Sequence, residues 1–246
     1  MAAYGAFARH YDALTKNVGY KARAAYFDGI IRDYAPGAKL LLDLACGTGS
    51  LSFEMAALGY EVIGVDSSPD MLSIAAQKNT GERPLMFLCQ KMQRLDLYGT
   101  VDAAVCALDS INHLTEQQLS ETLGRLGLFV APGGVFVFDA NTRCKHRKVL
   151  GANCFVYEHD DVYCVWQNNL LADDAVAITL DFFEGSGAGP YKRIREQFRE
   201  YIHEVKTLRG MLDDSGFELL KTFEADTKNP PTDNSERVVY VARRRV

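Results

Sequence analysis

The sequence lacks any spacing of cysteines or histidines that is typical of a metal site or a disulfide scaffold. Its six cysteines include no C-x-x-C pair, and its five histidines include no H-x-x-x-H pair. Cys89 and Cys106 lie in apolar runs, which favours buried free thiols. We therefore expect no bound metal and no disulfide framework.

Long apolar runs and blocks of like charge are also missing. No run approaches the ~18 apolar residues of a membrane helix, and Met1–Tyr4 lacks the layout of a signal peptide, so we expect a cytoplasmic protein. The net charge is −5 over 246 residues. Without a general basic field, nucleic-acid binding is disfavoured. Arg243–Arg245 fits the solvated end of a last strand.

A nucleoside-binding pattern stands near the start of the chain. An apolar run over 39–44 ends in a glycine loop, and a helical pattern over 51–58 leads to a second apolar run over 60–65. Asp66 caps that run, nineteen residues after Gly47. This order is typical of the βαβ unit that binds a nucleoside: a strand, a glycine turn, a helix, and a second strand that ends in an acidic residue.

The sequence of the glycine loop argues against a dinucleotide-binding site. A dinucleotide fold needs a third glycine so that helix and strand pack closely over a pyrophosphate, but this chain has Ser52 there. The charge of Asp43, just before the turn, would oppose a pyrophosphate and suits an ammonium group. NAD-linked oxidoreduction is therefore a distant alternative.

The segment Asp43–Gly49 resembles the first motif of the class I S-adenosylmethionine (SAM)-dependent methyltransferases. The resemblance covers residues 36–143 strongly and 204–246 by pattern. It implies SAM as cofactor and a seven-stranded sheet whose last strand is antiparallel.

The remaining pattern fits that fold class. Strands expected at 85–89, 101–106 and 135–139 alternate with helices, which indicates an α/β, doubly wound, mostly parallel sheet. After about residue 150 the chain becomes rich in β-type runs with short turns, typical of an inserted antiparallel meander. We predict N-terminal helices and a SAM-binding core over 1–150, the insertion over 151–203, and a return to the core over 204–246.

The first group of candidate cofactor residues follows the glycine loop. A carboxylate at Asp66 can accept both ribose hydroxyls; capping the next helix is the alternative, but Ser68 already serves that purpose. Glycines let the backbone approach a ligand without a Cβ clash. The resemblance places the methionine part of SAM on the loop and the ribose or adenine beside the second strand, so the candidates are Asp43, Ala45, Cys46, Gly47, Gly49, Asp66, Ser67 and Met71.

A second group follows the third and fourth strands. Similar enzymes use an acid after the third strand to bind the adenine amino group, but Lys91 stands there and cannot accept a hydrogen bond. Gln90 or a backbone carbonyl would then supply that contact, beside the backbone of Met92. The segment Leu108–His113 resembles small-molecule methyltransferases that act on sugar amines and glycine-like amines. In that reading Leu108, Asp109 and Asn112 lie at the cofactor, and His113 is a candidate base; local turn bonding is the structural alternative.

The N-terminal helices complete the expected site. Tyr11, Asp12 and Tyr20 are expected to form a lid over the cofactor, or else to pack those helices on the core. Aromatic side chains of the insertion, among them Tyr157 and Trp166, either cover the acceptor or pack the sheet. The resulting hypothesis is methyl transfer to a small-molecule N or O acceptor, with RNA or protein methylation, or SAM binding without turnover, as alternatives. Neither the acceptor nor the oligomeric state follows from the sequence.

Overall fold

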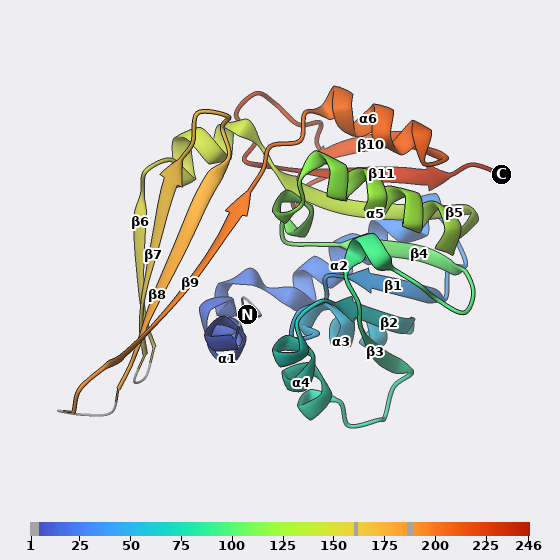
Figure 1. Ribbon diagram of the computed structural model, residues 1–246. Coiled ribbons are helices and arrows are strands. Elements are labelled where there is room, and N and C mark those ends of the chain that lie inside the picture. Colours follow the sequence, from blue (N-terminus) through green and yellow to red (C-terminus); the bar gives the residue numbers. More distant parts are fainter. Residues whose placement is uncertain (1–4, 160–161, 186–188) are drawn as a thin grey trace.

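Two β-sheets make up the protein in the computed structural model, which describes residues 5–159, 162–185 and 189–246 (Figure 1). The larger sheet has seven strands in the order β10-β11-β5-β4-β1-β2-β3, and the smaller has four in the order β6-β7-β8-β9. The helices, including short 3-10 and π-type turns, are α1 Gly5–Leu14, η1 Lys16–Val18, α2 Tyr20–Tyr34, α3 Ser50–Ala57, α4 Pro69–Lys78, η2 Met92–Arg94, η3 Ser110–His113, α5 Glu116–Phe129, η4 Lys145–Leu150 and α6 Val205–Asp214.

The strands of the large sheet are β1 Leu40–Leu44, β2 Glu61–Asp66, β3 Leu85–Cys89, β4 Val101–Cys106, β5 Val130–Asn141, β10 Phe217–Glu224 and β11 Arg237–Arg244. Strand β11 pairs antiparallel with both β5 and β10, whereas β1 to β5 pair in parallel. The predicted seven-stranded sheet with an antiparallel last strand is confirmed. The chain leaves β1 toward β2 and β3 and then returns to β4, so the strand order reverses between β1 and β4, where open α/β sheets bind ligands.

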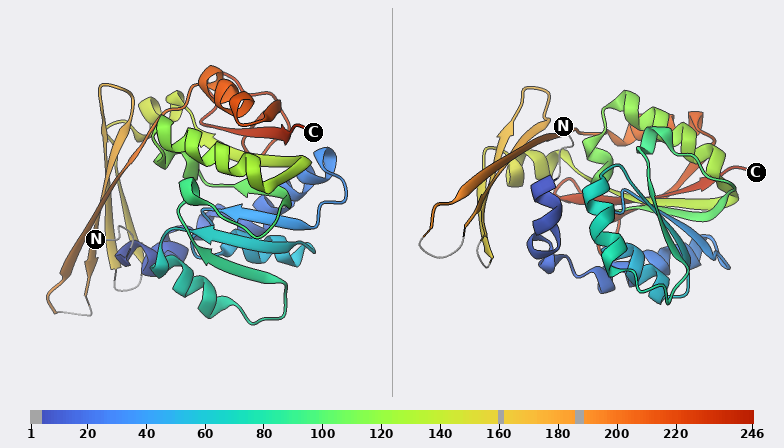
Figure 2. Two further views of the ribbon diagram at one scale, coloured as in Figure 1. Left: turned by 45° about the vertical axis from the view of Figure 1, so that its right-hand side comes forward. Right: turned by 60° about the horizontal axis from the view of Figure 1, so that its bottom comes forward.

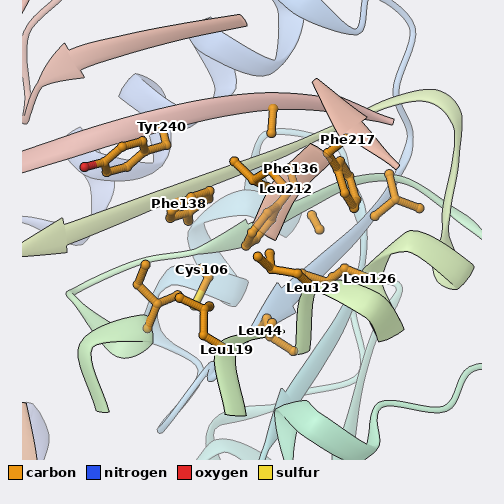
Figure 3. Packing of buried hydrophobic residues seen from close by; sticks show 14 of the residues in the cluster. Leu44, Cys106, Leu119, Leu123, Leu126, Phe136, Phe138, Leu212, Phe217 and Tyr240 are labelled. Atoms are coloured by element: carbon orange, nitrogen blue, oxygen red, sulfur yellow. The ribbon is translucent and has the colours of Figure 1, made fainter. Parts of the chain in front are cut away.

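Residues of the large sheet alternate between two apolar layers, as the pleat requires. In β5, Phe136 and Phe138 pack toward α5 and α6 together with Leu44, Cys106 and Tyr240 (Figure 3). Their neighbours belong to the opposite layer, against α2 and α3, which buries Leu41, Val105, Val135, Val137 and Val239. Burial on both faces explains why these strands read as continuous apolar runs.

Strand β5 is longer than the sequence pattern indicates. It was expected at 135–139 but begins at Val130, directly after α5. The pairing with β4 shifts register between Val101 and Ala103. The segment containing Pro132 and Gly133 is therefore accommodated as an irregularity inside the strand instead of a turn before it.

The inserted meander is confirmed as a separate sheet of β6 Cys154–His159, β7 Val162–Leu170, β8 Val176–Glu184 and β9 Lys192–Glu200, all paired antiparallel. Figure 2 shows α1 between this sheet and α4. A third apolar cluster joins Phe7 of α1 to Cys164, Ile178 and Phe182. Helix α1 therefore links the insertion to the core.

Among the described residues, no helix is long and apolar enough to cross a bilayer. The six cysteines are free thiols. Cys106 is buried as expected, but Cys89 is exposed, because β3 is the edge strand and its outer residues have no neighbouring strand to cover them.

Candidate functional site

A cavity of about 480 Å³ lies at the carboxyl ends of β1, β2 and β4. Helix α1 and the antiparallel sheet also contribute to its lining. Its lining comes from segments far apart in the chain: Phe7, Tyr11, Leu14, Thr15, Val18, Ala45, Gly47, Asp66, Ser67, Ser68, Met71, Lys91, Met92, Gln93, Leu108, Asp109, Ser110, His113, Leu114, Gln118, Tyr157, Trp166, Phe198, Glu200 and Arg237.

The glycine loop after β1 forms one wall. Its backbone is left-handed at Ala45 (φ 61°), Gly47 (φ 56°) and Gly49 (φ 76°). A Cβ at Gly49 would come within 2.8 Å of the Phe87 ring, so glycine is required there on two grounds. Gly49 does not line the cavity; it shapes the loop and begins α3.

Asp66 fastens this loop to the end of β2. One carboxylate oxygen accepts the backbone N–H of Gly47 at 2.9 Å, and the other accepts that of Ser68 at 2.8 Å. Burial raises the pKa of Asp66, and these hydrogen bonds oppose the shift. Each oxygen retains a lone pair, and the residue lines the cavity beside Ser67 and Met71.

Asp43 lies behind the loop and is almost fully buried. The Ser52 hydroxyl donates to its carboxylate, which explains why a serine stands where a dinucleotide fold has glycine. Burial raises the pKa of Asp43 to about 7, although the Ser52 hydrogen bond works against this. Asp43 reaches a small side cavity of about 30 Å³ that Tyr20 and Cys46 also line. Burial raises the pKa of the Cys46 thiol as well, which disfavours a nucleophilic thiolate.

The loop after β4 carries two consecutive left-handed residues, Leu108 (φ 58°) and Asp109 (φ 54°). Both of their backbone N–H groups donate to the buried carboxylate of Asp139, and Arg23 donates to it at 3.3 Å. Asp109 in turn forms an ion pair with Arg237. Burial disfavours the charge on Asp109, but the positive charge of Arg237 outweighs it and lowers the pKa of Asp109.

Asn112 does not take the predicted position at the cofactor. Its side chain is fully buried and lies outside the cavity lining. The amide oxygen accepts the backbone N–H of Asn141 at 2.9 Å, and the amide nitrogen donates to the backbone oxygen of Tyr201 at 2.8 Å. Asn112 therefore holds η3 against the ends of β5 and β9.

Gln90 is likewise occupied by the fold. Its side chain exchanges two hydrogen bonds with the backbone of Asp96, at 2.9 and 3.0 Å, and it does not line the cavity. Lys91 and Met92 do line it. The sequence-based choice of Gln90 as an adenine acceptor is thus not supported, which leaves backbone carbonyls for that contact.

Helix α1 lines the cavity and also packs into an apolar cluster, so the lid and the packing roles both stay predictions; we refer to α1 as the lid. Tyr11 lines both the main and the side cavity. The Asp12 carboxylate accepts hydrogen bonds from the hydroxyls of Thr48 and Ser50 and from Lys78 at 2.9 Å. Burial opposes the charge on Asp12, but these donors lower its pKa overall. Asp12 thereby ties the lid to the glycine loop and to α4.

Several lining residues have no signal in the sequence. Phe198 and Glu200 belong to the last strand of the insertion, and Arg237 begins the final strand. No local motif marks them, and only the packing of the insertion over the loop after β4 brings them to the site. Tyr157 and Trp166 line the cavity and also pack against each other, with ring centroids 6.3 Å apart, so both readings of the insertion's aromatic residues stay predictions.

Comparisons with known proteins agree with this architecture. A family model described as a methyltransferase domain matches residues 41–134. YqeM of Bacillus subtilis (strain 168), which is named as a methyltransferase, is 31% identical over 244 residues, covering 98% of this chain and 97% of YqeM. The crystal structure of a S-adenosylmethionine-dependent methyltransferase from Clostridium acetobutylicum ATCC 824 matches at a TM-score of 0.86 and 28% identity, covering 99% of both chains.

A further relative shares part of its length with this chain. The dTDP-3-amino-3,6-dideoxy-alpha-D-glucopyranose N,N-dimethyltransferase of Streptomyces fradiae is 33% identical over 138 residues, which are 55% of this chain and 53% of that protein. The glycine loop, the seven-stranded sheet and full-length similarity lead to one conclusion: the chain belongs to the class I S-adenosylmethionine-dependent methyltransferases and is an enzyme of that family.

Proposed function

We propose that this enzyme methylates a nitrogen or oxygen atom of a small molecule enclosed between the core and the antiparallel sheet. The observation that carries the proposal is the wall of the cavity formed by Tyr157, Trp166 and Phe198. These side chains come from the antiparallel sheet and, with the glycine loop, line the same cavity, whose volume is about 480 Å³. That volume is within the range of small-ligand pockets, and a folded macromolecule would need an open groove.

The residues at the core side of the cavity fit SAM. The carboxylate oxygens of Asp66 can accept the ribose hydroxyls while they keep their bonds to the loop. The adenosine would be surrounded by Ser67, Met71, Lys91 and Met92. The amino-acid part would lie against the backbone of Ala45 and Gly47, with Asp43 behind that backbone. The negative charge of Asp66 complements a cationic ligand.

SAM supplies a methyl group on a positively charged sulphur that is already a good leaving group. The chain's own contribution is therefore to orient the acceptor, to exclude water and to manage a proton. Tyr11 of the lid and Phe198 of the insertion cover the space from two sides. Orientation of this kind can lower a barrier by ~7–11 kcal/mol when the reacting atoms are well placed.

The Streptomyces fradiae relative is named for the dimethylation of a nucleotide-linked amino sugar, which supports a small-molecule acceptor. The net charge of −5 also disfavours the rival hypothesis of RNA methylation. Protein methylation would require an extended segment to enter the cavity past the lid.

The proposal is tested by measuring which class of molecule receives the methyl group. The purified enzyme, given SAM with a tritiated methyl and a cell extract separated into metabolite, RNA and protein fractions, should label the metabolite fraction. Label confined to RNA or protein would refute the proposal. Asp66→Ala serves as the negative control, since it removes the ribose acceptor.

A further inference from the structure

Three side chains that can bind a proton converge at the acceptor side of the cavity. Asp109 follows β4, His113 ends η3 and Glu200 ends β9, and one oxygen or nitrogen atom of each lies within 4.8 Å of those of the others. All three residues line the cavity. The cluster is assembled from the core and the insertion together.

Glu200 is held in place but not fully used by the fold. Its side chain is only 4% exposed, and Oε2 accepts a hydrogen bond from the Asn141 amide at 2.9 Å. His146 Nε2 lies 3.3 Å from the same oxygen. In the described part of the chain no hydrogen bond uses Oε1. Oε1 is not one of the buried side-chain atoms left without a partner, so it is open to the cavity that Glu200 lines. A ligand that donates a hydrogen bond to this charged oxygen there gains affinity.

The His113 ring packs against its surroundings but forms no hydrogen bond with any residue that the structure describes. Its ring lies edge-on to Phe198, with the ring centroids 5.2 Å apart. Nδ1 is buried, and no residue within the described ranges hydrogen-bonds to it. A histidine kept for structure uses at least one ring nitrogen in the fold, as His203 does toward the backbone oxygen of Ile111. His113 is thus available to accept a proton.

The surrounding charges favour an organic cation over a metal ion. Asp109 is already paired with Arg237. The guanidinium of Arg237 would repel a divalent ion bound to the Asp109 carboxylate. The other charged groups that act on the cluster include Arg23 of α2, Lys145 and His146 of η4, and Asp139 of β5. Burial, followed by the charge of Arg237, lowers the pKa of Lys145, so that this amine competes less for the carboxylates.

We propose that the acceptor is a primary or secondary amine whose ammonium group binds Asp109 and Glu200 and whose proton passes to His113. The proposal rests on the proposed function and names its acceptor atom. An ammonium group donates two or three hydrogen bonds and matches two carboxylates, which only accept. A hydroxyl group donates only one and cannot donate to both carboxylates at once.

The proton and electron balance is complete. The ammonium nitrogen gives one proton to the His113 ring and becomes neutral. Its lone pair forms the new N–C bond to the methyl carbon as the C–S bond breaks, and that electron pair remains on the sulphur of S-adenosylhomocysteine. The methylated nitrogen carries the positive charge that the sulphur has lost.

The experiment compares two ring compounds of nearly the same shape, cyclohexylamine and cyclohexanol. Each is titrated calorimetrically into the enzyme saturated with S-adenosylhomocysteine, so the readout does not depend on turnover. The amine should bind about tenfold or more tightly than the alcohol, as expected for charge-assisted hydrogen bonds. Glu200→Gln should abolish that preference, whereas Glu158→Gln, at an exposed position of β6, should keep it.

His113 has its own readout. In protein labelled with ¹⁵N-histidine, the ring nitrogen signals that disappear in His113→Asn should shift on addition of cyclohexylamine and stay unchanged with cyclohexanol. Unchanged signals would remove His113 from the proposal. An unchanged melting temperature and S-adenosylhomocysteine affinity in both site variants would show that they fold.

An amine that binds no better than cyclohexanol, or binds equally well to Glu200→Gln, overturns the inference. Label from SAM that appears on hydroxyl metabolites also overturns it but leaves the proposed function intact. Label confined to macromolecules defeats the proposed function itself. The two failures are therefore distinguishable.

Discussion

Replacement of Asn112 by alanine separates a structural role from a ligand-binding one. The sequence suggested a cofactor contact, but the structure places this amide in the interior, between the ends of β5 and β9. Asn112→Ala would leave the backbone N–H of Asn141 and the backbone oxygen of Tyr201 without those partners. The expected primary effect is thus a loss of stability in the ligand-free protein.

The size of the effect follows from the two broken contacts. A buried polar group left unsatisfied costs about 1–3 kcal/mol, so two such groups should lower the free energy of unfolding by about 3 kcal/mol. For a protein of this length, the corresponding fall in melting temperature is about 6–12 °C. Because the same contacts hold the end of β9, Glu200 should also become less well positioned.

Urea unfolding without ligand measures the free energy directly, and S-adenosylhomocysteine titration measures binding separately. Asn169→Ala, at an exposed site on β7, provides the matched control and should change the free energy of unfolding by about 0.5 kcal/mol or less. A loss below about 1 kcal/mol in Asn112→Ala, together with a large loss of affinity, would refute the structural assignment and restore the cofactor contact.

Three further changes test the cofactor side. Asp66→Ala should weaken S-adenosylhomocysteine binding by more than about tenfold, through loss of a charged acceptor, and an unchanged dissociation constant in calorimetry would contradict this. Lys91→Asp should bind equally or more tightly, since a carboxylate can accept from an amino group; a large loss would show that Lys91 contacts the ligand. Asp43, with its pKa raised by burial to about 7 from 3.8, holds a proton in the folded state that the unfolded chain releases. Its contribution to the free energy of unfolding therefore falls as pH rises from about 4 to about 7, and Asp43→Asn should flatten the measured curve there; an identical slope would exclude this role.

Local sequence determined the part of the site that we propose binds the cofactor. Asp43, the glycines at 47 and 49, and Asp66 stand within one βαβ unit, where the backbone path follows from strand, turn and helix signals that lie next to one another. The alternation of buried strands and amphipathic helices was enough to predict the seven-stranded sheet. The boundaries of β5 were less predictable because the pairing with β4 absorbs an irregular segment.

Tertiary structure alone decided the part of the site that we propose binds the acceptor. Glu200 and Arg237 lie far along the chain from Asp109, and no spacing in the sequence records that β9 and β11 end beside the loop after β4. The tertiary structure also changed the roles predicted for Asn112 and Gln90 from cofactor contacts to structural contacts. The sequence could not show this, because a side-chain amide can hydrogen-bond to a ligand or to a backbone group equally well. Short-range geometry is encoded in neighbouring residues, whereas a contact between distant segments depends on how whole sheets and helices pack.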